Sequence, residues 1–474
     1  KMIDLKKNLK YRAVTLIKSI SGIRGTIGGA VGEGLSPLDI VKFSAAYGTW
    51  LQEENNAKKL NIVVGRDARI SGPIVSDLVI ATLRSLGINV LDLGLSTTPT
   101  VEMAVAMEKA HGGIILTASH NPKQWNALKL LNEKGEFISG SEGEKILSLA
   151  ASEQFQFAEV DDLGKLSTNN EYIQKHIEAV LKLPYVDKAA IEAADFKIVV
   201  DAVNSTGGIA VPILLDALGV KRVEGIHCEP TGEFAHNPEP LPEHLKDLSD
   251  AIVEQKADLG ITVDPDVDRL AMVCEDGSMF GEEYTLVAVA DYVLSQNGGS
   301  TVSNLSSTRA LRDVTEKHGH QYYASAVGEV NVVEKMKAVN AVIGGEGNGG
   351  VILPELHYGR DALAGIALFL THLAKSAVKV TELRDSYPKY TISKNKIQLT
   401  PEVNVDEILV NMAKKYSQQE VDSTDGVKIY FEKEWVHLRK SNTEPIIRIY
   451  AESENNAKAD QLAQDIIKDI QEII

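Results

Sequence analysis

Helical and strand patterns alternate along most of this 474-residue chain. Three times, a helical pattern ends at a glycine and an apolar strand pattern follows: 88–93 after Gly87, 220–226 after Gly219, and 322–327 after Gly319. Glycine is favoured just past a helix end because it adopts the left-handed conformation without steric cost. A helix that leads into a buried strand is the repeating unit of α/β folds. The pattern therefore predicts three related α/β domains.

Apolar runs also lead into the most polar loops of the chain. Residues 112–116 and 259–263 are predicted to be buried strands, and each is followed by a loop rich in Ser, Asn or Asp. Near the C-terminus, strand patterns at 427–431 and 446–450 precede an amphipathic helical pattern at 458–474. The C-terminal part thus has an organisation of its own.

Two polar stretches mark candidate linkers, at 151–165 and 384–388, and a third boundary falls near 275–277. A chain of this length is expected to divide into several domains. We expect four, at residues 1–160, 161–275, 276–386 and 387–474. Residues 1–15 are left without an assignment.

The run Thr117–Pro122 places a small nucleophile directly after the strand predicted at 112–116. Asn-Pro is a turn signal, and the residue before a proline is disfavoured in a helix. We therefore expect Ser119 on a sharp exposed turn at the carboxyl edge of a sheet, where open α/β folds bind their ligands. An ordinary Ser-Asn-Pro turn is the alternative.

Asp264, Asp266 and Asp268 alternate with other residues in a single short run. Alternate residues of an extended segment point the same way, so we expect three carboxylates to converge on a hard cation, Mg²⁺ or Ca²⁺. The spacing also fits an EF-hand loop, but the sixth position, which needs glycine, is Arg269. Strand patterns flank the run, whereas an EF-hand requires helices. A solvated acidic turn is the remaining alternative.

The glycine-rich run Gly344–Gly350 follows the apolar residues 341–343 and contains a formal G-x-G-x-x-G match. A dinucleotide-binding loop opens a helix, whereas Pro354 follows here within four residues, and Glu346 would face a pyrophosphate. A carboxylate and an amide suit sugar hydroxyls better, because both accept hydrogen bonds from OH groups. We expect Glu346 and Asn348 to bind a sugar.

A turn near the C-terminus combines two guanidinium groups with two hydroxyls and an amide. Together these groups would form a phosphate cradle, because an arginine fork matches phosphate geometry. The expected phosphate-binding residues are Arg439, Ser441, Asn442, Thr443 and Arg448. A basic surface turn is the alternative.

Four loops of this chain, in this order, resemble those of the α-D-phosphohexomutases. They are the Thr-x-Ser-His-Asn-Pro loop, the D-x-D-x-D-R loop, the Gly-Glu-rich loop and the R-x-S-N-T-x-P loop. Further matches are Ser21–Gly25, Gly65–Gly72, Asp201–Asn204, Phe234 and Pro238–Pro240. The resemblance runs from about Lys18 to the end of the sequence. It implies an α/β protein with three similar mixed α/β domains plus a smaller C-terminal α+β domain around a central cleft.

The resemblance also implies a mechanism. The resting enzyme would carry phosphate on Ser119, itself a fourth ligand of Mg²⁺ beside the three aspartates. A sugar hydroxyl would attack this phosphate in line and give a sugar 1,6-bisphosphate, which also serves as the primer of the reaction. The arginine-containing loop would hold the phosphate that is not reacting, and Arg269 would contact substrate beside the metal.

Other expected catalytic residues come from the same resemblance. Lys129 and Arg24 match charged residues near the phosphoserine, and would stabilise charge or move the hydroxyl proton. His120 would touch the phosphoserine or pack against the turn.

The sequence departs from the family at the end of the sugar loop. Many relatives have a histidine there, a candidate acid or base, whereas this chain has Gly350. Proton transfer would then rest on Lys129, on another group such as His357, or on water.

The sugar loop also bears on the substrate. Its Gly-Glu-x-Asn-Gly-Gly form is closer to that of prokaryotic phosphoglucosamine mutases than to the Gly-Glu-Met-Ser-Gly-His form of phosphomannomutase/phosphoglucomutases. We expect interconversion of glucosamine 6-phosphate and glucosamine 1-phosphate, with phosphomannomutase/phosphoglucomutase activity as the alternative. More distant alternatives are a sugar-phosphate phosphohydrolase, which has no use for a second phosphate site, and a non-catalytic sensor, which has no use for the nucleophile.

The amino-acid composition narrows the range of expected binding partners. A net charge of −17 argues against a nucleic-acid or anionic-membrane surface, so the expected partner is a small hexose phosphate. Cys228 and Cys274 have no metal or redox spacing, which is typical of reduced cysteines in a cytoplasmic protein. No apolar run is long enough to span a membrane, and the oligomeric state is left open.

Overall fold

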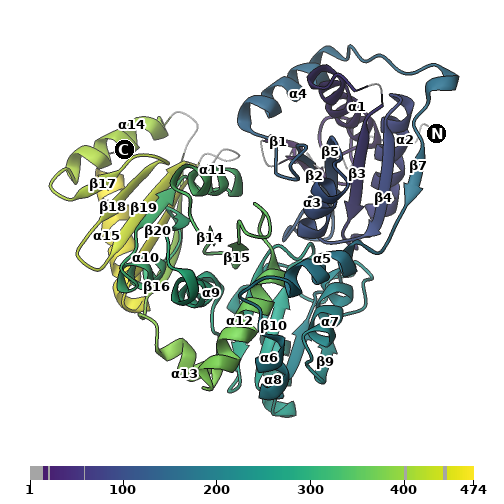
Figure 1. The fold of residues 1–474 in the computed structure, drawn as a ribbon. Helices are drawn as coiled ribbons and strands as arrows, with labels where there is room; N and C mark the ends of the chain where they lie inside the picture. Colours follow the sequence, from purple (N-terminus) through teal and green to yellow (C-terminus); the bar gives the residue numbers. More distant parts are fainter. Residues whose placement is uncertain (1–13, 20–21, 58, 400–402, 441–445, 474) are drawn as a thin grey trace, which may run out of the picture.

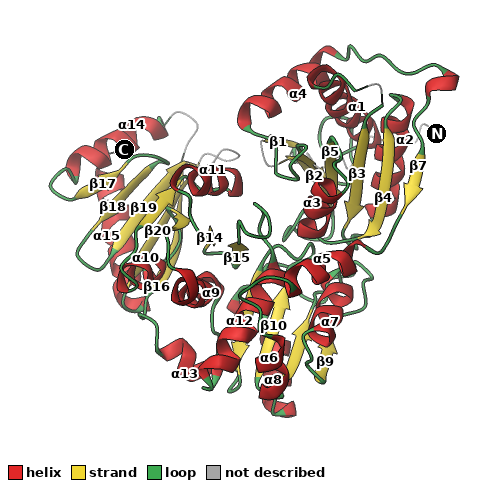
Figure 2. Ribbon diagram, viewed as in Figure 1, coloured by secondary structure: helices red, strands yellow, loops and turns green. Residues whose placement is uncertain are grey.

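The structure is a computed structural model that describes residues 14–19, 22–57, 59–399, 403–440 and 446–473. The sheets follow one another along the chain. The N-terminal sheet, in purple and blue, and the C-terminal sheet, in yellow, lie at opposite ends of the molecule (Figure 1), and helices pack against each sheet (Figure 2). No helix within the described ranges has both the length and the apolar character needed to cross a bilayer.

The N-terminal sheet has the strand order β1-β2-β6-β5-β3-β4-β7. Its strands are β1 (Ile17–Ser19), β2 (Gly22–Thr26), β3 (Asn61–Arg66), β4 (Asn89–Leu95), β5 (Gly112–Leu116), β6 (Trp125–Leu131) and β7 (Leu166–Thr168). Its helices are α1 (Pro37–Glu54), α2 (Gly72–Ser85), α3 (Thr98–Met107) and α4 (Gly140–Ser152). The domain ranges expected from the sequence stay a prediction, and β7, which lies past residue 160, joins this first sheet.

The second sheet has the order β11-β10-β8-β9. Its strands are β8 (Lys197–Asp201), β9 (Arg222–Ile226), β10 (Leu259–Val263) and β11 (Leu270–Cys274). Its helices are α5 (Tyr172–Leu181), α6 (Lys188–Ala194), α7 (Gly207–Ala217) and α8 (Lys246–Gln255), with a short 3₁₀ turn at Pro242–His244. Another 3₁₀ turn, at Val160–Asp162, precedes β7 of the first sheet.

The third sheet has the order β13-β12-β14-β15. Its strands are β12 (Thr301–Asn304), β13 (Tyr322–Ser325), β14 (Ile343–Glu346) and β15 (Gly350–Ile352). Its helices are α9 (Glu282–Asn297), α10 (Ala310–Lys317), α11 (Glu329–Val339), α12 (Ala362–Ser376) and α13 (Val380–Asp385).

These three sheets share one strand pattern. Three parallel strands lie in the order β4-β3-β5, β9-β8-β10 and β13-β12-β14, and a fourth strand, β6, β11 or β15, returns antiparallel to the third. The helix-ending glycines predicted from the sequence have the left-handed φ values of +84°, +88° and +79° at Gly87, Gly219 and Gly319. The internal repeat is therefore confirmed. In each repeat, a polar run connects the third strand to the fourth. This run is Thr117–Pro122 in the first sheet, the run of three aspartates at 264–268 in the second, and Gly344–Gly350 in the third.

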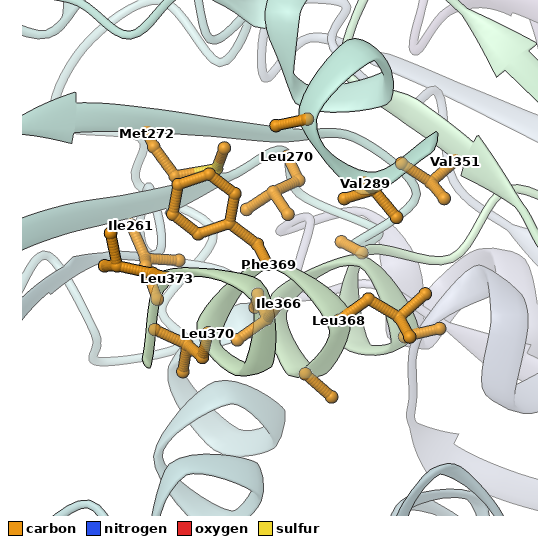
Figure 3. Close-up of a cluster of buried hydrophobic side chains, with 14 of the residues drawn as sticks. Ile261, Leu270, Met272, Val289, Val351, Ile366, Leu368, Phe369, Leu370 and Leu373 are labelled. Carbon is orange, nitrogen blue, oxygen red and sulfur yellow. The ribbon is translucent and has the colours of Figure 1, made fainter. Parts of the chain in front are cut away.

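The second and third sheets share a hydrophobic core built around α12 (Figure 3). Phe369 of α12 lies in this cluster with Met272 of β11, and its ring meets that of Phe280 edge-on at a centroid distance of 5.2 Å. The start of α12 is fixed to the aspartate loop, because the backbone N–H of Ala362 donates to Val267 O at 3.2 Å. Core packing thus sets the position of the residues just before α12.

The C-terminal sheet is antiparallel, in the order β16-β20-β19-β18-β17. Its strands are β16 (Thr391–Gln398), β17 (Glu420–Asp422), β18 (Val427–Tyr430), β19 (Trp435–Lys440) and β20 (Ile446–Ser453), and its helices are α14 (Val405–Lys415) and α15 (Asn456–Ile473). The strands and the helix expected in this part of the chain are confirmed, with α15 beginning two residues earlier than its apolar pattern. This part has its own core.

Candidate active site

Ser119 lies in the turn between β5 and β6, as the sequence predicted. Its φ of +48° is in the left-handed region, which is uncommon for a residue with a side chain. The expectation of an exposed turn is wrong, because the residue is only 6 % exposed. The aspartate loop of the second sheet covers it, and Ser119 Oγ donates a hydrogen bond to Asp264 Oδ2 at 2.9 Å.

The buried side chain of Arg69 holds the serine turn in this conformation. Its guanidinium N–H groups donate to the carbonyl oxygens of Ser119, Asn121, Pro122 and Trp125 at 2.5–3.0 Å. Asp67 accepts from Arg69 Nε at 3.0 Å and from Thr117 Oγ1 at 2.7 Å, so the charge of the guanidinium is balanced. The sequence marked the segment 65–72 as a family match but gave Arg69 no role.

The three aspartates do converge, but through a turn rather than an extended strand. Val267 has a φ of +63°, and its N–H donates to Asp264 O at 3.1 Å, so the chain reverses between Asp264 and Asp268. The predicted alternation of an extended segment is therefore wrong, whereas the predicted cluster is present. One oxygen from each of Asp264, Asp266 and Asp268 lies within 4.8 Å of the others, and all three residues are fully buried.

This cluster fits a divalent cation. Within the described residues, Oδ1 of Asp266 and Oδ1 of Asp268 are buried and accept no hydrogen bond. Burial, together with the charges of Asp268 and Asp266, raises the pKa of Asp264 well above its usual value. Buried carboxylates that repel one another need a compensating charge. An all-oxygen set of this kind is the donor set that Mg²⁺ prefers.

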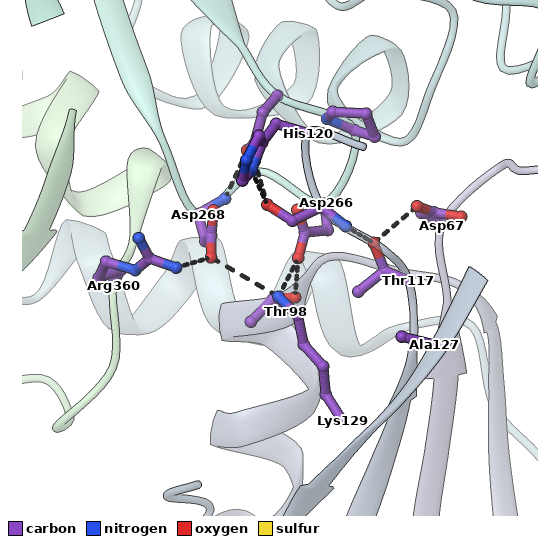
Figure 4. Close-up of polar contacts among 12 residues, drawn as sticks. Asp67, Thr98, Thr117, His120, Ala127, Lys129, Asp266, Asp268 and Arg360 are labelled. Atoms are coloured by element: carbon purple, nitrogen blue, oxygen red, sulfur yellow. Dashed lines mark hydrogen bonds and ion pairs between the residues drawn. The ribbon is translucent and has the colours of Figure 1, made fainter. Parts of the chain in front are cut away.

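Lys129 of β6 and Thr98 of α3 both bind the carboxylate of Asp266 (Figure 4). Lys129 Nζ lies 2.9 Å from Asp266 Oδ2 and 3.8 Å from Asp268 Oδ2, and Thr98 Oγ1 donates to Asp266 Oδ2 at 2.6 Å. Burial alone would lower the pKa of Lys129, but these two aspartates outweigh it and raise that pKa. Lys129 is therefore a buried cation rather than a surface lysine.

The other expected charged residues lie around the same cluster. Arg24 of β2 lies opposite Ala127 of β6, on the same face of the sheet as Lys129. Arg269 pairs with Glu239 at 3.3 Å. Ring nitrogen Nδ1 of His120 lies 3.3 Å from Ser119 Oγ; burial and then the nearby arginines lower the pKa of His120 well below its usual value.

Arg360 is a site residue that the sequence did not single out. Its guanidinium donates to Asp268 Oδ2 at 2.6 Å, to Glu346 Oε2 at 3.0 Å and to Glu329 Oε2 at 3.0 Å. It therefore joins the aspartate loop to the sugar loop. No local motif marks it, because its partners lie in three different segments of the chain.

The glycine-rich run forms a tight turn between β14 and β15, where Glu346 pairs with Gly350. It opens no helix, which excludes the dinucleotide-binding interpretation. Glu346 Oε1 accepts from Asn304 Nδ2 at 2.7 Å and from Gly328 N at 3.1 Å. Burial would raise the pKa of Glu346, but Arg360 outweighs it and the pKa is lowered. Glu346 is thus a carboxylate in a fixed position.

Arg439 and Arg448 are directly opposed on β19 and β20, so their side chains share one face. Ser441, Asn442 and Thr443, expected in the same cradle, lie outside the described residues. A pocket of about 240 Å³ joins the two arginines to the sugar loop. Its lining includes Arg269, Asn304, Glu346, Asn348, Lys394, Arg439 and Arg448. Cations and hydrogen-bonding groups from three sheets therefore face one space.

Four family models match consecutive parts of the chain. They describe α/β/α domains I, II and III of phosphoglucomutase/phosphomannomutase, at residues 16–157, 171–277 and 281–390, and the C-terminal domain of the same enzymes, at residues 394–469.

Individual relatives agree with these models. A phosphoglucomutase/phosphomannomutase of Thermococcus kodakarensis is 36 % identical over 95 % of this chain and 98 % of its own length. A phosphoglucosamine/phosphogalactosamine mutase of Sulfurisphaera tokodaii is 32 % identical over 96 % and 98 %. The crystal structure of a Burkholderia thailandensis family protein matches with a TM-score of 0.81 and 25 % identity, covering 96 % of this chain and 97 % of that one. The chain belongs to the phosphoglucomutase/phosphomannomutase family and is a phosphohexomutase, an isomerase that transfers phosphate within a hexose phosphate.

Proposed function

We propose that this phosphohexomutase interconverts glucosamine 6-phosphate and glucosamine 1-phosphate through a phosphorylated Ser119 and a sugar 1,6-bisphosphate. The observation that carries the proposal is the placement of Ser119 Oγ 2.9 Å from Asp264 Oδ2, at the edge of a buried three-aspartate cluster. A serine that served only in a turn would not need acidic partners from a different sheet.

Transfer of the phosphoryl group requires two exchanges at phosphorus. In the first, a hydroxyl oxygen of the sugar bonds to phosphorus while the bond from phosphorus to Ser119 Oγ breaks. That electron pair stays on Oγ, which takes up the proton that the sugar hydroxyl releases. In the second, Ser119 takes the other phosphoryl group back from the bisphosphate. Mg²⁺ held by Asp264, Asp266 and Asp268 would neutralise charge on the transferring group. Lys129, a buried cation 2.9 Å from Asp266 Oδ2, adds positive charge at the same place.

The rest of the pocket suits the part of the substrate that does not react. Arg439 and Arg448 supply two cations for the second phosphate, and we propose that Ser441, Asn442 and Thr443 also bind this phosphate. Glu346 and Asn348 offer acceptors to sugar hydroxyls, with Arg269 beside them. A phosphohydrolase would release its single phosphate and would gain nothing from this second cationic region. A sensor would not need the serine.

The choice of glucosamine rests on the form of the sugar loop. The Sulfurisphaera relative is named for glucosamine and galactosamine phosphates, which agrees with it. The second candidate, a phosphoglucomutase/phosphomannomutase, is favoured by the Thermococcus relative, which is 36 % identical and carries that name. The candidate substrates differ at C2, and one substituent changes specificity by about 10–200-fold.

The test is a comparison of kcat/KM for glucosamine, glucose and mannose 1-phosphates, each primed with its 1,6-bisphosphate. We expect the highest value for glucosamine 1-phosphate. A higher value for glucose or mannose 1-phosphate would replace the proposed substrate and leave the mutase reaction in place. Release of inorganic phosphate without isomerised product would instead contradict the proposed reaction.

A further inference from the structure

Two histidines and two carboxylates meet where helices of the first three domains come together. Glu102 is on α3, His176 is on α5, and Asp361 is the N-cap of α12, with His357 four residues before it. His176, Asp361 and Glu102 are at most 2 % exposed. The reaction steps proposed above assign no role to these side chains, and His357, one of the candidates for proton transfer, is held within this cluster.

The imidazole rings of His176 and His357 are oriented in the same way. Nε2 of His176 and Nε2 of His357 lie 2.8 and 3.0 Å from the same atom, Asp361 Oδ2. Their other ring nitrogens face fixed oxygens: His176 Nδ1 lies 2.9 Å from Thr100 Oγ1, and His357 Nδ1 lies 3.4 Å from Glu102 Oε2. In each ring, Nε2 therefore faces Asp361 Oδ2, whereas Nδ1 faces a different oxygen, that of Thr100 or of Glu102.

Hydrogen bonds alone do not satisfy this cluster while its histidines are neutral. A neutral histidine that donates from Nε2 has a lone pair on Nδ1, and in His357 this lone pair faces the carboxylate of Glu102, another acceptor. In the described part of the chain, both oxygens of Glu102 and Nδ1 of His357 are buried and have no hydrogen-bond partner. Buried polar groups are rarely left in this state.

We propose that Asp361 Oδ2, His176 Nε2 and His357 Nε2 bind a zinc ion, with water as the fourth ligand. The Nε2 lone pairs then point at the cation, and each Nδ1 carries the proton, which it donates to Thr100 or Glu102. This is the usual partnership of a metal-bound histidine, whose second nitrogen donates to a carboxylate or another fixed oxygen. Two imidazoles and a carboxylate are also a typical donor set for tetrahedral Zn²⁺.

The distances between the three ligand atoms fit a tetrahedral zinc site after a small adjustment. The three ligand atoms lie within 4.8 Å of one another. Ligand atoms of a tetrahedral zinc site are about 3.3 Å apart, so the two nitrogens would move away from Asp361 by about 0.3–0.5 Å. The nearby aspartate cluster offers oxygen atoms alone and suits Mg²⁺. The two sites therefore differ in the metal that they select.

The zinc site would hold together elements that support the aspartate cluster. Thr100 follows Thr98 in the first turn of α3, and Thr98 Oγ1 binds Asp266 at 2.6 Å. Asp361 follows Arg360, which binds Asp268 at 2.6 Å. A cation between His176 and Asp361 thus fixes the first, second and third domains behind these contacts.

Co²⁺ is the probe for the experiment, because tetrahedral Co²⁺ absorbs strongly in the visible region whereas octahedral Co²⁺ absorbs weakly. The full-length, metal-stripped protein is titrated with Co²⁺ in excess Mg²⁺, and then with Zn²⁺. We expect one tetrahedral Co²⁺ per chain, displaced by one equivalent of Zn²⁺. His357→Gln should abolish the tetrahedral signal, and Glu102→Gln should weaken Zn²⁺ binding about 10–100-fold.

The matched control is His318→Gln, which removes another histidine that contacts a carboxylate, with Nε2 2.7 Å from Asp291 Oδ1. This variant should bind Co²⁺ as the unchanged protein does. Absence of a saturable tetrahedral signal in the unchanged protein would overturn the proposal, whether or not the variants fold. A signal that His357→Gln leaves intact would overturn it equally.

Discussion

Ser119 Oγ lies 2.9 Å from Asp264 Oδ2, although 145 residues separate the two in the chain. Each residue lies in the turn between the third and fourth strands of the shared sheet pattern, one in the first sheet and the other in the second. The repeated topology therefore places a nucleophile and a carboxylate in equivalent loops that face each other. In the third sheet, Glu346 ends the third strand of the pattern directly before the same turn.

Ser119→Ala should remove nearly all mutase activity, a loss of at least about 1,000-fold, because the proposed covalent carrier is gone. Intact-mass measurement should show one phosphate on the unchanged protein and none on the variant. Ser152→Ala, which alters an exposed serine on α4, is the control and should keep both phosphate and activity. Full turnover by Ser119→Ala would disprove the phosphoserine mechanism.

Asp266→Asn should lower Mg²⁺-dependent turnover by about 100-fold or more, because it replaces a charged oxygen ligand of a catalytic cation. Turnover measured against Mg²⁺ concentration should also show a higher half-saturating concentration. Asp276→Asn, at the hairpin after β11, removes an acidic group away from the cluster and should change neither value. If Asp266→Asn only lowered the melting temperature, the cluster would be structural.

The sequence predicted most of the individual parts of the site. The strands at 112–116 and 259–263 were found at those positions, and the glycine-ended helices indicated the repeat. Such features are local, because backbone propensity and side-chain periodicity decide them. The reversal at Val267 was missed, since left-handed φ is unusual for a β-branched residue and no local signal marks it.

What the sequence could not predict is the set of contacts between domains. Arg69 was placed in a motif without a role because its partners, the carbonyls of the serine turn, carry no side-chain signature. Thr98 and Arg360 bind aspartates of the second sheet from the first and third domains. Contacts of this kind depend on how the sheets are placed in space, which periodicity does not specify.

Arg439→Ala should raise the KM for the hexose phosphate about 10–100-fold with a smaller effect on kcat. The expected phosphate contact exists in both ground and transition states, so its loss weakens both equally. The variant also loses the ion pair with Asp425 at 2.8 Å, which is partly exposed and contributes little to stability. Arg312→Ala, which breaks an exposed pair on α10, is the matched control. An effect confined to kcat would place the arginine in the chemistry.

Glu283 gives the stability of the protein a dependence on pH. Burial raises the pKa of this carboxyl from 4.5 to about 8, beyond the opposing effect of Lys394. Between these values the folded state binds more protons than the unfolded state, so stability falls as pH rises from 4.5 to about 8.

Glu283→Gln should remove this dependence, because the amide oxygen can still accept from Thr308 N, 2.9 Å from Glu283 Oε2. Denaturant unfolding should show little difference at pH 4.5, and a variant more stable by about 4–5 kcal/mol at pH 8.5. Glu224→Gln, on an exposed position of β9, should show no such trend. A difference that is the same at both pH values would contradict the assignment.

Arg360 occupies the space beside Gly350, the last residue of the sugar loop. A Cβ placed on Gly350 would lie 2.3 Å from Cδ of Arg360, closer than any ordinary contact. The arginine also forms ion pairs with Asp268, Glu346 and Glu329. A histidine at this position is therefore incompatible with the arginine, and the two should behave as alternatives.

Gly350→His should destabilise the protein by about 3 kcal/mol through overpacking, and Arg360→Ala by about 3–5 kcal/mol, because it leaves buried carboxylates without their cation. In the double variant, the space that Arg360 leaves accommodates the imidazole. The loss of unfolding free energy caused by Gly350→His should then be about 1–2 kcal/mol smaller in the Arg360→Ala background than in the presence of Arg360. Urea unfolding of the four proteins measures this coupling, and strictly additive costs would show that the two side chains do not compete for one space.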